Sequence, residues 1–361
     1  MDNGLDIDMR SLLALHAALY RAPRPRLPID FSRAAAGDWA DASLRRLAAT
    51  GAVPDWRAAD QALEWLAQPG HRVLLSSGRG YPARLRAAQG SPWLLFVDGD
   101  PASLAAPQLA IVGSRQATPR GRDIAQDFAR QLAAGGVVIT SGLARGIDGA
   151  AHRGALAAGG RTIAVLGAAV DRIYPAAHRE LAAAVRDAGA LVSEFPFGTA
   201  PLPGHFPLRN RIISGLALGT LVVEAAPRSG SLSTALHALE QGREVFAVPG
   251  SILNPLSRGC HALIKQGAKL TEEVADILDE LPELRTLVHL EAQASSTHAS
   301  TAPLALDDAC LLGECGWDPF TVDDAVERSG LTVQEVSSML MRLELAGIVQ
   351  VQGTGSYLRI R

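Results

Sequence analysis

The chain of 361 residues is 48% hydrophobic and 5% aromatic, which is enough for two or three domains with aliphatic cores. Its formal net charge of −3 neither favours nor excludes nucleic acid, and its three cysteines are too few for a disulfide framework or a zinc knuckle. The acidic start MDNGLDIDMR lacks the positive charge of a signal peptide, and no apolar run is long enough to span a membrane. We therefore expect a cytoplasmic protein with reduced thiols and with no metal, cofactor or membrane partner.

Residues 1–67 are predicted to form a small helical domain. Apolar residues recur at helical spacing in three segments, and Asp41 and Asp55 are expected to cap the second and third of them. A proline-rich stretch, RAPRPRLP, separates the first helix from the next. From residue 71 to 98 the pattern changes to short strands, which we expect to join the main sheet.

A doubly wound α/β sheet is predicted over residues 71–284. Its strands, such as Leu109–Val112 and Val137–Thr140, are apolar and end in glycine-containing turns that lead into helices. This repeat is typical of an extended Rossmann-like domain, whose ligands bind beyond the carboxyl ends of the strands. Neither G-x-x-x-x-G-K-[ST] nor G-x-G-x-x-G occurs at these turns, which argues against a P-loop hydrolase and against a dinucleotide cofactor.

Glycines, serines and arginines gather at the predicted strand ends, in a stretch (101–270) that carries 17 basic and 10 acidic residues. Turns with free backbone N–H groups accept phosphate, and guanidinium groups match its oxygens. FPLRNR adds to its two arginines an aromatic ring, on which a base can stack. The predicted DNA-binding residues are Gly113, Ser114 and Arg115 in the first turn, Ser141, Gly142 and Arg145 in the second, Phe206, Arg209 and Arg211 in FPLRNR, and Ser229 and Gly230 at a later helix start.

Other interpretations of these residues stay open. Phe206 could pack in the core while the arginines pair with Glu194 and Glu224. Asp148 and His152 could act as acid and base, although such a pair more often fixes a turn. A nucleotide-binding sensor, or an enzyme that cleaves nucleoside monophosphates, would use the helix start SGSLST for the phosphate and Glu194 or Glu224 for the chemistry.

Residues 285–305 are small and polar at their centre and are predicted to form a flexible linker. In residues 306–361 the pattern predicts one helix that ends at Gly330, a longer helix from Thr332, and a hairpin, which together make a winged helix. This segment carries 4 basic and 9 acidic residues. The phosphates of DNA would therefore repel the helix predicted from Thr332. Protein docking or regulation is favoured there over transcription-factor activity.

The ordered motifs IVGSR, TSGLARGIDGAAHRGAL, HFPLRNRIISGL, LVVEAAPRSGSLSTALHALEQGREVFAVPG and LIKQGA closely resemble the DNA-processing protein A family (DprA, also called Smf). The resemblance covers residues 73–281 and extends more loosely to both flanks. It implies an extended Rossmann-like domain between a helical, sterile-alpha-motif-like domain and a winged helix.

The resemblance also implies a function. It suggests a homodimer that binds single-stranded DNA without sequence preference and loads the RecA recombinase during natural transformation. By position, IVGSR and FPLRNR fall in the DNA-facing pocket, and Lys265 in LIKQGA lies near the segment that the family uses for dimer and RecA contacts. We therefore expect a recombination mediator, not an enzyme.

Overall fold

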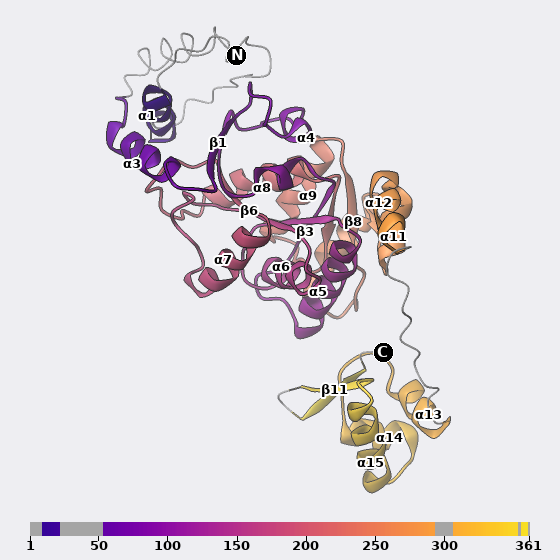
Figure 1. Ribbon diagram of the computed structural model, residues 1–361. Coiled ribbons are helices and arrows are strands. Elements are labelled where there is room, and N and C mark those ends of the chain that lie inside the picture. The colour runs from indigo at the N-terminus through magenta and orange to yellow at the C-terminus, as the bar shows by residue number, and fades with distance from the viewer. Residues whose placement is uncertain (1–8, 22–52, 293–305, 353–354, 360–361) are drawn as a thin grey trace. The chain divides into compact units, whose positions relative to one another are not determined.

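The computed structural model describes residues 9–21, 53–292, 306–352 and 355–359. The chain forms two compact units, residues 1–295 and residues 296–361. Figure 1 shows the larger unit as a sheet with helices on both of its faces. Across the described ranges, no helix is both long and apolar enough to cross a membrane.

A nine-stranded sheet with the order β1-β2-β6-β5-β4-β3-β7-β8-β9 forms the centre of the larger unit. Strands β3 to β9 run parallel, whereas β2 pairs antiparallel with both β6 and β1. This arrangement confirms the predicted α/β class. The strands are β1 (His71–Leu75), β2 (Leu94–Gly99), β3 (Gln108–Val112), β4 (Val138–Ser141), β5 (Thr162–Val165), β6 (Ala190–Ser193), β7 (Gly219–Val222), β8 (Glu244–Ala247) and β9 (Lys269–Leu270).

Side chains alternate along each strand between two hydrophobic layers. In β3, Ala110 and Val112 face one layer, and Leu109 and Ile111 face the other. In Figure 1, α8 and α9 lie on one side of β3, and α5 and α6 lie on the other. The first layer packs against α4 (Ala83–Arg86), α8 (His205–Leu216), α9 (Gly230–Glu240) and α10 (Arg258–Lys265), and the second against α5 (Pro119–Ala134), α6 (Ile147–Ala157), α11 (Val274–Glu280) and α12 (Pro282–Ala292).

The order of the strands reverses at β3. The chain first builds β4, β5 and β6 on one side of β3 and then returns to place β7 on its other side. The carboxyl ends of β3 and β7 therefore border a topological switch point, which is where doubly wound sheets bind their ligands. The turns that follow β3 and β4 both lie at this carboxyl edge of the sheet.

The N-terminal helices α1 (Met9–Arg21) and α3 (Trp56–Leu66) pack on the sheet. Their apolar residues share a hydrophobic cluster with β2 and with α7 (Arg179–Ala188), so they belong to the same compact unit. Asp55 caps α3 as predicted, because its Oδ1 accepts a hydrogen bond of 3.0 Å from the backbone N–H of Ala58. Asp41, the other predicted cap, lies outside the described residues.

The C-terminal unit has the predicted winged-helix architecture. Helices α13 (Leu306–Cys315), α14 (Val322–Ser329) and α15 (Val333–Leu345) pack with a sheet of order β10-β12-β11, whose strands are β10 (Phe320–Thr321), β11 (Val349–Gln352) and β12 (Ser356–Arg359). Gly330 ends α14 in the left-handed conformation, and Thr332 caps α15 with a capping box. The predicted linker needs a correction, because α12 extends to residue 292; residues 293–305 lie outside the described residues.

Candidate nucleic-acid interface

The turns after β3 and β4 pack against each other at the carboxyl edge of the sheet. The backbone N–H of Ile147 donates a 3.2 Å hydrogen bond to the carbonyl of Ser114, and the N–H of Ser114 donates a 2.7 Å bond to the carbonyl of Glu224. Gly146 has a φ of +77°, and a Cβ there would lie 2.2 Å from the carbonyl oxygen of Ser114. The two predicted turns are thus brought together, with the side chains of Arg115 and Arg145 exposed.

An aromatic cluster lies beside Arg115. The Cζ atom of Arg115 is 4.9 Å from the centroid of the Phe206 ring, a cation–π arrangement. The ring of Tyr174 is 5.8 Å from that of Phe206, centroid to centroid, and tilted by 49°. A Cβ at Gly167 would lie 2.7 Å from Cδ1 of Phe206, so the backbone after β5 closely approaches this ring. Phe206 was among the predicted site residues and Tyr174 was not, although Tyr174 is an aromatic residue in the loop after the third parallel strand.

Arg209 is a buried support of these turns, which corrects the prediction that it lies open in a basic pocket. Its side chain is on α8, only 3% of the residue is exposed, and its Nη1 donates to the carbonyls of Gly142, at 2.7 Å, and of Val165. Burial lowers the pKa of Arg209 to about 10, which nearby Asp148 partly offsets. A Cβ at Gly142 would lie 2.3 Å from Nη1, so a side chain at this position would have to displace the guanidinium that crosses the turn.

Arg211 pairs with Glu194, as the alternative interpretation foresaw. Its Nη1 and Nη2 lie 2.5 and 2.6 Å from the two carboxylate oxygens, and the hydroxyl of Tyr20 on α1 donates to the same carboxylate. Glu194 is 1% exposed. Burial alone would raise its pKa, but the charge and hydrogen bonds of Arg211 and the bond from Tyr20 hold the pKa below its ordinary value. The prediction that Arg211 lies open in the pocket is therefore corrected as well.

The carboxylate of Glu224 is also hydrogen-bonded within the protein, but its partner is not an arginine. It accepts hydrogen bonds from the backbone N–H of Thr118, at 2.9 Å, and from the Thr118 hydroxyl, at 2.7 Å. That hydroxyl in turn caps α5 by accepting from the N–H of Gly121. Each of the two candidate carboxylates for a nucleotide-cleaving enzyme, Glu194 and Glu224, is thus bound to the protein itself.

Asp148 and His152 do not form an acid–base pair. Asp148 accepts from the backbone N–H groups of Gly142 and Ala144, at 3.2 and 3.3 Å, so it fixes the turn after β4. His152 is fully buried against Thr162, with 2.7 Å between its Nδ1 and the hydroxyl oxygen. Burial lowers the pKa of His152 to about 3.

The remaining predicted residues lie on several elements. Ser141 is buried and donates to the carbonyl of Ile111 at 2.6 Å, which is a structural role. Ser229 caps α9 at the carboxyl edge, next to Gly230. Lys265 is exposed at the end of α10, which leads into the amino end of β9, so it lies at the other edge of the sheet from Arg115.

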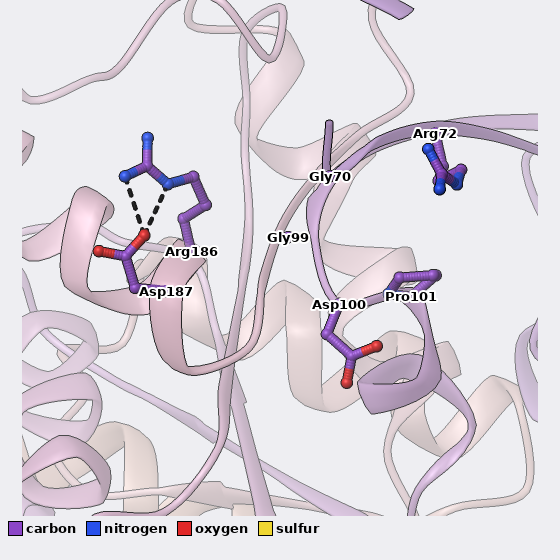
Figure 2. Close-up of a pocket in the computed structure, with 7 residues that line it drawn as sticks. All are labelled: Gly70, Arg72, Gly99, Asp100, Pro101, Arg186 and Asp187. Atoms are coloured by element: carbon purple, nitrogen blue, oxygen red, sulfur yellow. Dashed lines mark hydrogen bonds and ion pairs between the residues drawn. The ribbon is translucent and has the colours of Figure 1, made fainter. Parts of the chain in front are cut away.

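A cleft of about 390 Å³ also lies at the amino edge, and Figure 2 shows its lining residues. Gly99 at the end of β2 pairs with Ala190 at the start of β6, which places the cleft away from the predicted turns. Arg186 is bound to its neighbour Asp187 at 2.8 Å, and the carboxylate of Asp100 accepts from the N–H of Ala102. The cleft has balanced charges, Arg72 and Arg186 against Asp100 and Asp187, and therefore does not match the predicted anion site.

Comparison with known proteins agrees with this architecture. A family model described as DNA recombination-mediator protein A matches residues 72–282, more than half of the chain. The chain belongs to the DNA recombination-mediator protein A family. A second model, described as the DprA winged helix domain, matches residues 295–354 of this family member.

Members of this DprA family are similar along most of the chain. Protein Smf of Escherichia coli strain K12 is 47% identical over 303 residues, which are 84% of this chain and 81% of that protein. The X-ray structure of DprA from Streptococcus pneumoniae has a TM-score of 0.60 at 38% identity, covering 76% of this chain and 94% of that one. The DNA processing protein A of Helicobacter pylori, described for its single-stranded DNA binding mode, has a TM-score of 0.53 at 28% identity, covering 59% and 96%.

Proposed function

We propose that this chain binds single-stranded DNA at the carboxyl edge of its sheet, across the turns after β3 and β4 and the start of α8. The observation that carries this proposal is the exposed guanidinium of Arg115 over the ring of Phe206 at the switch point, with 4.9 Å between Cζ and the ring centroid. A cation beside aromatic rings suits a polymer that presents phosphates and flat bases together. The Helicobacter pylori relative, described for single-stranded DNA binding, supports the same ligand.

Charge for the phosphates comes from exposed arginines. Arg115 and Arg145 occupy the turns after β3 and β4, and Arg228 precedes α9 at the same edge. Arg209 and Arg211 lie beneath them and hold α8 against the strand ends. Because such contacts go to phosphates and base faces instead of base edges, binding is expected to be independent of sequence.

A salt series on oligo-dT tests the proposal. Three neutralised phosphates give a slope of log affinity against log salt of about −2, and Arg115→Ala should reduce this slope by about 0.7. Arg161→Ala is the matched control, since Arg161 is exposed at the amino end of β5, and it should leave the slope unchanged. Equal binding by the parent and Arg115→Ala would show that the site is misplaced, and stronger binding to duplex DNA would contradict single-strand recognition.

We further propose that two copies associate. Exposed apolar side chains occur on α9, which packs on β7 and β8, and at the β8–β9 side of the sheet: Leu236 and Leu239 on α9, Ile252 and Leu253 after β8, and Leu270 on β9. Covering such a surface with a second copy would remove it from water, and two linked DNA sites would bind one strand with higher avidity. Light scattering should show a dimer for the parent and a monomer for Leu253→Glu; an unchanged mass would refute this interface.

The finer role that we propose is loading of RecA onto the bound strand during natural transformation. It rests on membership in a family of recombination mediators and on the proposed DNA site. In a RecA ATPase assay on strands coated with single-strand-binding protein, the parent should shorten the lag and Arg115→Ala should not. A lag that the parent leaves unchanged would exclude the loading role while leaving DNA binding intact.

We infer that the chain acts as a recombination mediator and catalyses no reaction on nucleotides. Glu194 and Glu224, the two candidates for the carboxylate that the nucleotide-cleaving alternative needs, are held by Arg211 and Thr118. Incubation with nucleoside monophosphates should release no free base. Base release that disappears in Glu224→Gln would favour the enzyme instead.

A further inference from the structure

Two arginines lie together at the amino edge of the sheet, the opposite edge from the proposed DNA site. Arg84 belongs to α4, and Arg243 directly precedes β8. The Nη2 atom of Arg243 donates a 3.1 Å hydrogen bond to the backbone carbonyl of Arg84, which brings these two segments into contact. The side chain of Arg84 is 20% exposed and Arg243 is half-buried, so neither guanidinium is a fully hydrated surface charge.

The positive charge of these two arginines is only partly balanced. Glu283, in the first turn of α12, pairs with Arg84 at 3.3 Å between Oε2 and Nη2, and its side chain is 64% exposed. The Nε atom of Arg243 is buried and has no hydrogen-bond partner among the described residues. Burial lowers the pKa of Arg243, the charge of Arg84 lowers it further, and Glu283 offsets part of this effect. Two guanidinium groups thus share one exposed carboxylate.

We propose that Arg84 and Arg243 form a binding site for a phosphate-type oxyanion, either inorganic phosphate or a small phosphate monoester. Guanidinium groups match phosphate oxygens with parallel hydrogen bonds, and a phosphate monoester carries a charge of about −1.5 to −2 at neutral pH. That charge balances two guanidinium groups, whereas a carboxylate balances one. A bound phosphate would replace Glu283, whose exposed side chain can turn to solvent, and would join α4 to the turn before β8.

Thermal melting of the full chain in a series of inorganic phosphate concentrations, with ionic strength held constant by sodium chloride, tests this site. Every protein in the series carries Arg115→Ala, so that phosphate at the proposed DNA site contributes little. Phosphate at ten times its dissociation constant should raise the melting temperature by about 3 °C. The rise should be lost on adding Arg84→Gln or Arg243→Gln. It should persist on adding Arg161→Gln, the matched control, whose guanidinium is exposed at the amino end of β5.

Glu283→Gln gives a result that a fold defect cannot produce. Removing the competing carboxylate should lower the dissociation constant for phosphate about fivefold, because a charge at about 4 Å contributes about 1 kcal/mol in water and 1.4 kcal/mol is a factor of ten. The same titration with glycerol 3-phosphate separates the two sources of the anion. A response to both ligands assigns the site to phosphate monoesters as well, and a response to inorganic phosphate alone assigns it to the free anion.

Three outcomes would overturn the inference. An equal rise in melting temperature with and without Arg84→Gln and Arg243→Gln would be a general salt effect. Phosphate binding that Glu283→Gln leaves unchanged or weakens would show that the anion does not replace this carboxylate. Arg84→Gln alone, with Arg115 intact, should bind oligo-dT as the parent does, and weaker binding would assign Arg84 to the DNA site instead.

Discussion

The buried ion pair of Arg211 and Glu194 gives a quantitative prediction of stability, which tests whether Arg211 is bound within the protein instead of available to DNA. Glu194 is 1% exposed, and both of its oxygens are held by Arg211 at 2.5 and 2.6 Å. Replacing Arg211 with methionine leaves that carboxylate buried with Tyr20 as its remaining side-chain hydrogen-bond partner among the residues that the structure describes. Removing one partner of a buried pair costs about 3–5 kcal/mol, so Arg211→Met should lower the free energy of unfolding by that amount.

Urea denaturation measures this cost, and two variants calibrate it. Adding Glu194→Gln to Arg211→Met removes the orphaned charge and should restore most of the loss. Arg130→Met breaks an exposed pair with Asp127, whose side chains are 53% and 52% exposed, and should cost less than about 1 kcal/mol. If Arg211→Met unfolds at the parental urea concentration, Arg211 is not committed to Glu194, and its availability to DNA would have to be reconsidered.

Further predictions concern pH, backbone conformation and helix capping. Burial lowers the pKa of His152 to about 3, below its value in the unfolded chain, so the free energy of unfolding should fall as pH drops from about 6.5 towards 3. In urea titrations between pH 7.5 and 5, the parent should lose about 2 kcal/mol more of this free energy than His152→Gln. Equal losses in the two proteins would refute this prediction. Gly146→Ala, at φ +77° and against the Ser114 carbonyl, should lower the melting temperature by the equivalent of more than about 1 kcal/mol, whereas an unchanged value would show that the turns relax freely. Thr332→Ala should destabilise the winged helix by about 1 kcal/mol in circular-dichroism melts, and no change would mean that the cap contributes nothing.

The sheet and the winged helix were predictable because their signals are local. The strand at Leu109–Val112 is apolar on both faces, as a parallel strand covered by two helical layers must be. Thr332 with Glu335 three residues later marks a helix start by itself. The start of the predicted linker was less well determined, since the small polar composition at the centre of 285–305 gave no sign that α12 runs to residue 292.

Whether the arginines of FPLRNR are buried or exposed was not predictable from the motif. Arg209 bonds to the carbonyl of Gly142, 67 residues away, and no pattern in FPLRNR separates a buried guanidinium from an open one. Arg211 and Glu194 were recognised as a possible pair from their opposite charges, but Glu224 binds Thr118 instead. Tyr174 was missed because a single aromatic residue in a loop has no periodicity; its exposure and its distance from Phe206 are properties of the fold.

Photo-crosslinking with 5-iododeoxyuridine locates the bound strand on the protein, so it decides whether DNA lies at the carboxyl edge of the sheet. We expect crosslinks at the carboxyl edge of the sheet, in peptides that contain Tyr174 or Phe206, and a loss of these crosslinks in Arg115→Ala. Crosslinks that map to the amino-edge cleft around Arg72 and Arg186, or to the winged helix, would contradict it.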